Sequence, residues 1–381
     1  MIIDILDIVV ILMAFQCLLF AVFLIHRRDR KPANIHLATF FIVQLFIAIH
    51  IFIRHHHEFF LGPFPYLFFI GSPFYFLISP TLFLYTKSAA YTNSLYDKKQ
   101  IIHLLPFVVV LIFYVVVFHI QPMETKRQLI EHGFLVQRPF QIISTTVLFI
   151  QIGVYCGASL VLLRRYRARL KEEYSSLAHI NLSWLGFFLY GYLTAWATSI
   201  VFFLSSSLFS SAPAWLSVVN NLAFLLFFTM IFYKGLLQPH LFAGIEEKPK
   251  YLTSKLNRTD ADEYAAALET YMVSAKPYRE PSLVLNDLAA QLGIPPRFLS
   301  QVINEYHHKN FFDFINEYRI NEARKMLCDP AGSTETILHI LYEVGFNSKS
   351  SFNAAFKKTT GLTPTQYRKH GAPEHAASPV D

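Results

Sequence analysis

Three consecutive histidines, His55, His56 and His57, come nearest in type and spacing to a reactive site. Imidazole binds transition metals and titrates close to neutral pH, and both His50 and Glu58 lie nearby in the sequence. Successive residues of a helix point in different directions, so a helix could not bring all three rings to one ion. Two interpretations stay open: a hydrated run of residues at a membrane interface, or a sensor of pH or metal.

Other signals of enzyme chemistry are absent from the sequence. Cys17, Cys156 and Cys328 have neither the spacing of metal ligands nor that of a disulfide framework. The chain also contains no P-loop, nucleophile elbow, HExxH zinc motif, or kinase or cyclase signature. We therefore expect no enzyme, with no catalytic residue, no metal and no cofactor.

Composition divides the 381 residues into two parts. The chain is 54% hydrophobic and 15% charged, with a mean hydropathy of +0.37, and the long apolar runs lie almost entirely in residues 1–240. Those residues hold 17 Lys and Arg against 9 Asp and Glu, whereas residues 241–381 hold 16 against 17. The basic excess belongs to the apolar part, so it is no evidence for nucleic-acid binding.

Seven apolar segments are long enough to cross a bilayer, which takes ~20 residues each. They lie at Ile5–Ile25, Ile35–Ile53, Pro65–Tyr85, Ile101–Ile120, Ile142–Leu163, Trp184–Leu204 and Ala214–Tyr233. Gly71, Pro73 and Pro80 predict a kink in the third. Loops on one side carry 13 Lys and Arg and those on the other carry 4. The positive-inside rule then predicts a multi-pass membrane protein with the N-terminus outside and the C-terminal part in the cytoplasm.

Polar residues inside these segments could form a site. They are Gln16, Gln44, His50, Ser144, Thr145, Thr146, Asn220 and Asn221, and none is an acid, a lysine or an arginine. Hydrogen bonds between neighbouring helices would account for them, and a ligand pocket is the alternative.

The second part has the periodicity of paired helix-turn-helix units. A helix is expected from Thr259, and a first unit turns at Gly293 and continues as a helix over about Pro296–Tyr306. An amphipathic helix over residues 310–327, ~27 Å long, leads to a second unit that turns at Gly345 and is capped by Ser348. Such a helix could hold two recognition helices about one DNA turn apart, ~34 Å.

Ordered motifs from about Tyr264 to Arg368 make this region resemble the DNA-binding domain of the AraC/XylS family. The motifs are Asp287-Leu-Ala-Ala-Gln-Leu-Gly, Phe311-Phe-Asp-Phe-Ile-Asn-Glu-Tyr-Arg, Tyr342-Glu-Val-Gly-Phe-Asn-Ser-Lys-Ser-Ser-Phe-Asn and Thr363-Pro-Thr-Gln-Tyr-Arg. Val284, Leu341 and Ala354 depart from the family pattern, which usually has a capping, a small and a basic residue there. The last two bear on how tightly the second unit holds DNA.

The resemblance implies which side chains meet DNA. Base edges would be read by Arg297, Ser300, Gln301 and Asn304 in the first unit and by Lys349, Ser350, Ser351 and Asn353 in the second. Phosphates would be contacted by Lys357, Lys358, Arg368 and Lys369.

We therefore expect an all-α chain in which a seven-transmembrane helical bundle precedes a cytoplasmic AraC-type double helix-turn-helix domain. The expected boundaries are 1–234 for the bundle, 235–258 for a linker, 259–370 for the DNA-binding domain and 371–381 for a disordered tail. The resemblance implies a one-component transcription regulator anchored in the bacterial inner membrane. Its expected partners are double-stranded promoter DNA, membrane lipid, RNA polymerase, a second copy of the chain, and an unknown small-molecule or physical signal. The alternative is a membrane transporter or receptor with an accessory DNA-binding domain.

Overall fold

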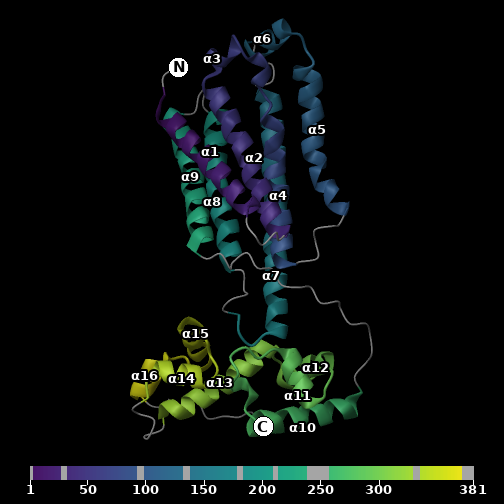
Figure 1. Cartoon of the computed structure of the whole chain (residues 1–381), viewed down its shortest axis with the longest axis vertical. Helices are drawn as coiled ribbons and strands as arrows, with labels where there is room; N and C mark the ends of the chain where they lie inside the picture. Colours follow the sequence, from purple (N-terminus) through teal and green to yellow (C-terminus); the bar gives the residue numbers. More distant parts are fainter. Residues whose placement is uncertain are drawn as a thin grey trace. The chain divides into compact units, whose positions relative to one another are not determined.

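Helices make up almost all of the regular structure in the computed structural model (Figure 1). The only β-type pairing among the described residues is one isolated bridge between Tyr174 and Val284. The expected all-α class is thus confirmed for the part of the chain that the structure describes, namely residues 3–26, 32–91, 98–131, 138–177, 183–208, 213–237, 257–328 and 335–370. Most of the expected linker and the expected tail lie outside these residues.

Two compact units make up the chain. The first comprises Met1–Arg164 and Leu182–Glu247, and the second comprises Arg165–Asn181 and Lys248–Asp381. Because residues 165–181 group with the C-terminal region, the second unit is assembled from two separate stretches of sequence.

Helices occupy all seven apolar segments of the first unit. The main ones are α1 (Ile5–Ile25), α2 (Pro32–His55), α4 (Tyr75–Ala90), α5 (Leu105–Tyr114), α7 (Arg138–Glu173), α8 (Ser183–Leu208) and α9 (Ala214–Leu237). Among the residues that the structure describes, six helical stretches are long and apolar enough to cross a membrane, whereas the seventh, Trp215–Ile231, is a shorter apolar helix. The number of spans therefore stays a prediction.

The third apolar segment has the irregular backbone that its glycine and prolines predict. Two 3₁₀ turns, Pro65–Leu67 and Ser72–Phe74, precede α4, and Pro80 lies inside that helix. A Cβ on Gly71 would stand 2.3 Å from the Cβ of His50, so the turn packs against α2 only because this residue has no side chain.

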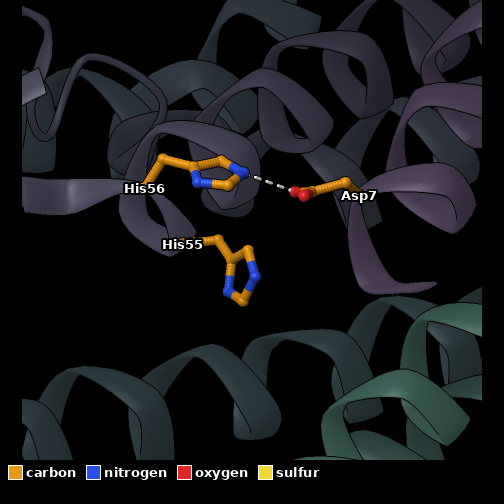
Figure 2. A group of neighbouring side chains, drawn as sticks. All are labelled: Asp7, His55 and His56. Atoms are coloured by element: carbon orange, nitrogen blue, oxygen red, sulfur yellow. Dashed lines mark hydrogen bonds and ion pairs between the residues drawn. The ribbon is translucent and has the colours of Figure 1, made fainter. Parts of the chain in front are cut away.

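The histidine run ties the end of α2 to the start of α1 (Figure 2). His55 Nε2 lies 2.8 Å from an Asp4 carboxylate oxygen, and His56 Nε2 lies 2.7 Å from one of Asp7. The two aspartates also cap α1 reciprocally. The ligand atoms of Asp7, His55 and His56 lie within 4.8 Å of one another, a grouping that could hold a metal ion. The pairing of His56 with Asp7 and of His55 with Asp4 already explains why the three are close. His57 belongs to the short α3 (His57–Leu61) instead.

Eight helical elements lie in the described residues of the C-terminal part of the second unit, 257–328 and 335–370. They are α10 (Arg258–Ser274), the 3₁₀ turn Pro277–Arg279, α11 (Leu285–Leu292), α12 (Pro296–His307), α13 (Phe311–Cys328), α14 (Ile337–Glu343), α15 (Lys349–Thr360) and α16 (Pro364–His370). One apolar core includes α13 as far as Ile315, and a second begins at Ile320. The single 18-residue helix α13 thus serves both helix-turn-helix units, as expected.

Candidate nucleic-acid interface

The first helix-turn-helix unit is formed by α11 and α12. Val284 precedes α11 and makes no side-chain cap, as expected, and Gly293 turns the chain with φ 68°. In α12, Leu299, Val302 and Ile303 are buried. Helical spacing therefore leaves the other face to the base-reading candidates.

These candidates already have partners within α12. The Gln301 amide donates to the Glu305 carboxylate at 2.8 Å, and the Asn304 amide donates to the Ser300 carbonyl at 2.9 Å. The Arg297 guanidinium lies 4.6 Å from the centre of the Phe298 ring, and Arg297 and Ser300 are half-buried. Each of these bonds uses one amide N–H, so within α12 Gln301 and Asn304 keep a second N–H and the amide oxygen for a base edge.

The second unit is formed by α14 and α15. Ser348 caps α15 as expected, its hydroxyl accepting from the Ser351 amide at 3.4 Å. Ser348 Oγ also bonds Ser350 Oγ at 2.8 Å. Lys349 and Ser350 are exposed, whereas Ser351 and Asn353 are half-buried. The start of α15 therefore offers at least two accessible polar side chains.

The four phosphate candidates differ in their surroundings. Lys357 and Lys369 are exposed. Lys358 pairs with Asp313 of α13 at 2.8 Å. Two guanidinium nitrogens of Arg368, Nε and Nη2, are buried without a hydrogen-bond partner among the described residues. Accessible positive charge is therefore clearest at Lys357 and Lys369, and the roles assigned to all twelve residues remain predictions.

A fully buried arginine, Arg319, stands between the two cores. Its Nε donates to the Tyr278 carbonyl and its Nη2 to the Glu280 carbonyl, both at 2.7 Å. Its guanidinium also lies 5.5 Å from the centre of the Phe346 ring of the second unit. Burial lowers the pKa of Arg319 to about 10. The side chain thus stays charged at neutral pH and joins the 278–280 segment to both helix-turn-helix units.

The stretch that follows α7 supplies the remaining acceptors. Arg319 Nη1 donates to the Ser175 carbonyl and Nη2 to the Ser175 hydroxyl, each at 3.2 Å. The Ser175 amide and hydroxyl in turn donate to the Leu283 carbonyl at 3.2 and 2.6 Å. Sequence reasoning missed this connection because it ended the fifth span at Leu163. The signal available was an arginine in the middle of an otherwise apolar helical stripe.

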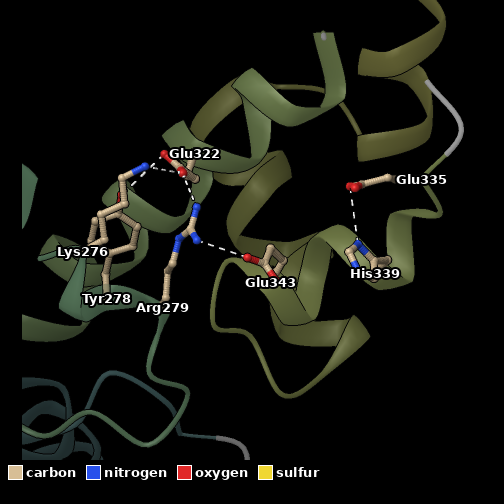
Figure 3. Close-up of polar contacts among 7 residues, drawn as sticks. All are labelled: Lys276, Tyr278, Arg279, Glu322, Glu335, His339 and Glu343. Carbon is tan, nitrogen blue, oxygen red and sulfur yellow. Dashed lines mark hydrogen bonds and ion pairs between the residues drawn. The ribbon is translucent and has the colours of Figure 1, made fainter. Parts of the chain in front are cut away.

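Ion pairs join the same segment to α13 and α14 (Figure 3). Glu322 accepts from Lys276 at 2.8 Å and from Arg279 at 2.7 Å, and Arg279 also donates to Glu343 at 3.1 Å. Burial alone would raise the pKa of Glu322, but the hydrogen bonds from Lys276 and Arg279 outweigh it and lower that pKa. The two helix-turn-helix units are therefore held together by polar contacts as well as by α13.

Comparisons with known proteins find similarity in the helix-turn-helix region of the chain. Residues 288–370 match the family model described as a helix-turn-helix domain. The chain is 28% identical over 119 residues to the melibiose operon regulatory protein of Escherichia coli (strain K12), covering 31% of this chain and 38% of that protein. It is 31% identical over 87 residues to the regulatory protein PocR of Salmonella typhimurium (strain LT2), covering 23% of this chain and 28% of that one.

One solved structure is also similar, the C-terminal domain of AraT, a response regulator from Geobacillus stearothermophilus. It is 25% identical, with a TM-score of 0.25, and the match covers 33% of this chain and 95% of that one. The chain spans less than two fifths of the length of the two curated relatives.

Proposed function

We propose that this chain, whose C-terminal region is an AraC-type helix-turn-helix domain, is a membrane-anchored one-component transcription regulator. The observation that carries the proposal is the presence, in one chain, of two helix-turn-helix units sharing α13 and of six helical stretches long and apolar enough to cross a membrane. Promoter DNA would be bound in the cytoplasm, with the N-terminus of the chain outside the bacterial inner membrane.

Helix α7 supports a direct route for the signal. It is one helix from Arg138 to Glu173, apolar in its earlier part, and the residues after Arg164 belong to the second unit. Ser175, two residues beyond its end, supplies two acceptors to Arg319. A shift of α7 would therefore act on the arginine that joins the two helix-turn-helix units.

Glu172 gives this route a second effect on DNA. Its carboxylate accepts from the amide of Asn304, a base-reading candidate, at 3.3 Å. In this arrangement a negative charge stands beside the first recognition helix, where it would repel DNA phosphates. A signal that withdraws α7 would break the bond between Asn304 and Glu172 and remove that charge.

Assembly completes the proposal. A second copy of the chain, paired through the first unit or through α10, would place two double units on one promoter and raise affinity through effective concentration. Membrane lipid surrounds the first unit, and RNA polymerase is the partner at the promoter.

Genome-wide mapping of the DNA bound by the intact protein, with and without candidate signals, tests the function. The matched control carries Arg297→Ala together with Gln301→Ala, which should empty the specific peaks while the protein stays in the membrane. Reporter fusions after Lys234 and near Glu131 test the orientation. A C-terminal reporter outside the cytoplasm would overturn the proposal, because the domain could not reach DNA.

A further inference from the structure

A cavity of about 740 Å³ lies inside the first unit. This volume is within the range of sites that bind small molecules. Residues from all seven helical segments line it, from Met13 of α1 to Phe224 of α9. A molecule in the cavity could therefore contact several of these segments at once, and α7 is within reach at Ser144 and Thr145.

Six of the eight intramembrane polar residues singled out from the sequence line this cavity. They are Gln44, His50, Ser144, Thr145, Asn220 and Asn221. Contacts between and within helices account for the last two, because Asn220 Oδ1 accepts from Thr198 and Ser199 and the Asn221 amide donates to the Ser217 carbonyl.

Gln44 and His50 are explained in this way only in part, since His50 Nε2 lies 3.5 Å from Ser72 Oγ but its other ring nitrogen has no such contact within the described part of the chain. Both are 4% exposed, and Gln44 Nε2 and His50 Nδ1 have no hydrogen-bond partner among the described residues. A polar atom left without a partner in an apolar interior is costly, more so where no water reaches it. These two atoms therefore indicate a bound molecule that supplies polar groups.

The charged residues of the cavity wall indicate the charge of that molecule. Arg54, one helical turn beyond His50, lines the cavity, and no Asp or Glu is among the described residues that do so. The rest of the wall is largely aromatic and aliphatic, including Phe113, Phe149 and Trp196. We infer that the cavity binds an anionic amphiphile, with its head at Arg54 and His50 and its alkyl chain among the aromatic rings.

Occupancy of this site is the signal of the regulator proposed above, and to that extent the inference rests on the proposed function. The binding of an anionic amphiphile in the cavity does not rest on the proposed function. An anionic head on an alkyl chain could come from a phospholipid of the bilayer or from a free amphiphile, and the two sources share the chemistry that the cavity recognises.

Trp196 provides the assay, because it lines the cavity. The full chain is placed in nanodiscs of neutral phosphatidylcholine and titrated with dodecyl phosphate that carries a terminal bromine, which quenches nearby tryptophan fluorescence. We expect saturable quenching that unbrominated dodecyl phosphate reverses and that Trp196→Phe removes. Thr145→Trp, which places an indole ring in the cavity, should weaken the binding of a spin-labelled dodecyl phosphate.

Substitution of the polar groups tests the chemistry. Arg54→Gln should weaken binding by about tenfold or more, the loss expected from one charge-assisted hydrogen bond, and should leave the binding of neutral dodecanol unchanged. Arg127→Gln is the matched control, since Arg127 lies in α6 (Met123–Glu131) outside the cavity wall and donates to the Gly62 carbonyl. Gln44→Leu tests the amide of the cavity wall in the same way, and Gln16→Leu is its control because Gln16 does not line the cavity.

The outcomes separate the possibilities. Displacement of the probe by phosphatidylglycerol would identify the bilayer as the source, and resistance to it would identify a free amphiphile; either supports the inference. Quenching that rises linearly and is the same in the Arg54 and Arg127 variants would overturn it, because that is partition into the bilayer. No DNA is present, so failure here would leave the proposed function standing, and failure to bind promoters would leave this result intact.

Discussion

Gly345→Ala should loosen the contact between the second helix-turn-helix unit and residues 278–279. Gly345 has φ 91°, and a Cβ there would stand 2.5 Å from the Tyr278 carbonyl oxygen and 2.7 Å from that of Arg279. The positive φ alone costs an L-residue roughly 1–2 kcal/mol. Relief of the overlap must also move the acceptor of Arg319 Nε, a bond to a charged group worth about 1.5–3 kcal/mol. Together these give a loss of about 3–5 kcal/mol.

Gly361→Ala is the matched control. Gly361 has φ 76°, but nothing lies within 4 Å of the added Cβ, so only the backbone strain applies. Thermal unfolding of a fragment spanning residues 165–181 joined to 257–370 measures both variants. At roughly 3–5 °C per kcal/mol for a fragment of this length, Gly345→Ala should melt about 5–15 °C below Gly361→Ala. Equal shifts would refute the argument, because the close approach to residues 278–279 would then carry no energy.

Three further predictions concern the same unit. Ser175→Ala removes the hydroxyl that donates to Leu283 and accepts from Arg319, so amide hydrogen exchange around residue 175 should become markedly faster. Ser176→Ala should change the exchange little, because the Ser176 hydroxyl donates to the exposed Asn347 at 3.1 Å. Equal exchange in both variants would count against the connection. Arg297→Ala should cost ~1–3 kcal/mol of binding free energy on the true operator alone. Lys357→Ala should weaken binding to operator and scrambled DNA alike and lower the slope of affinity against salt concentration by about one unit, as binding titrations at several salt concentrations would reveal. The same uniform loss of affinity in both variants would contradict the division into base-reading and phosphate-contacting residues. The lowered pKa of Glu322 means that its ionised form stabilises the fold above the unfolded pKa, near 4.5, and that this contribution disappears as pH falls through the folded value. Melting temperatures of wild type and Glu322→Gln should therefore differ at neutral pH and converge in acid, and a constant difference would exclude this cause.

Local signals account for what could be predicted from the sequence alone. Apolar runs of about 20 residues located the helices of the first unit, because every backbone group in a membrane must bond within its own helix. Gly293 and Ser348 located a turn and a cap, because a positive φ and an exposed helix start restrict residue type at one position. Helical periodicity likewise predicted that one helix would join two units, and α13 does so.

Only the tertiary structure decided how distant residues meet. Arg319 and Ser175 are 144 positions apart, and nothing near either residue in the sequence indicates the other. The same holds for the pairing of Lys358 with Asp313, which placed a predicted phosphate contact in an ion pair. The polar residues of the spans were visible as a list, but their convergence on one cavity depends on how seven segments pack. Periodicity and capping act over one or two helical turns, whereas these contacts depend on the packing of side chains from separate elements, which leaves no regular trace along the chain.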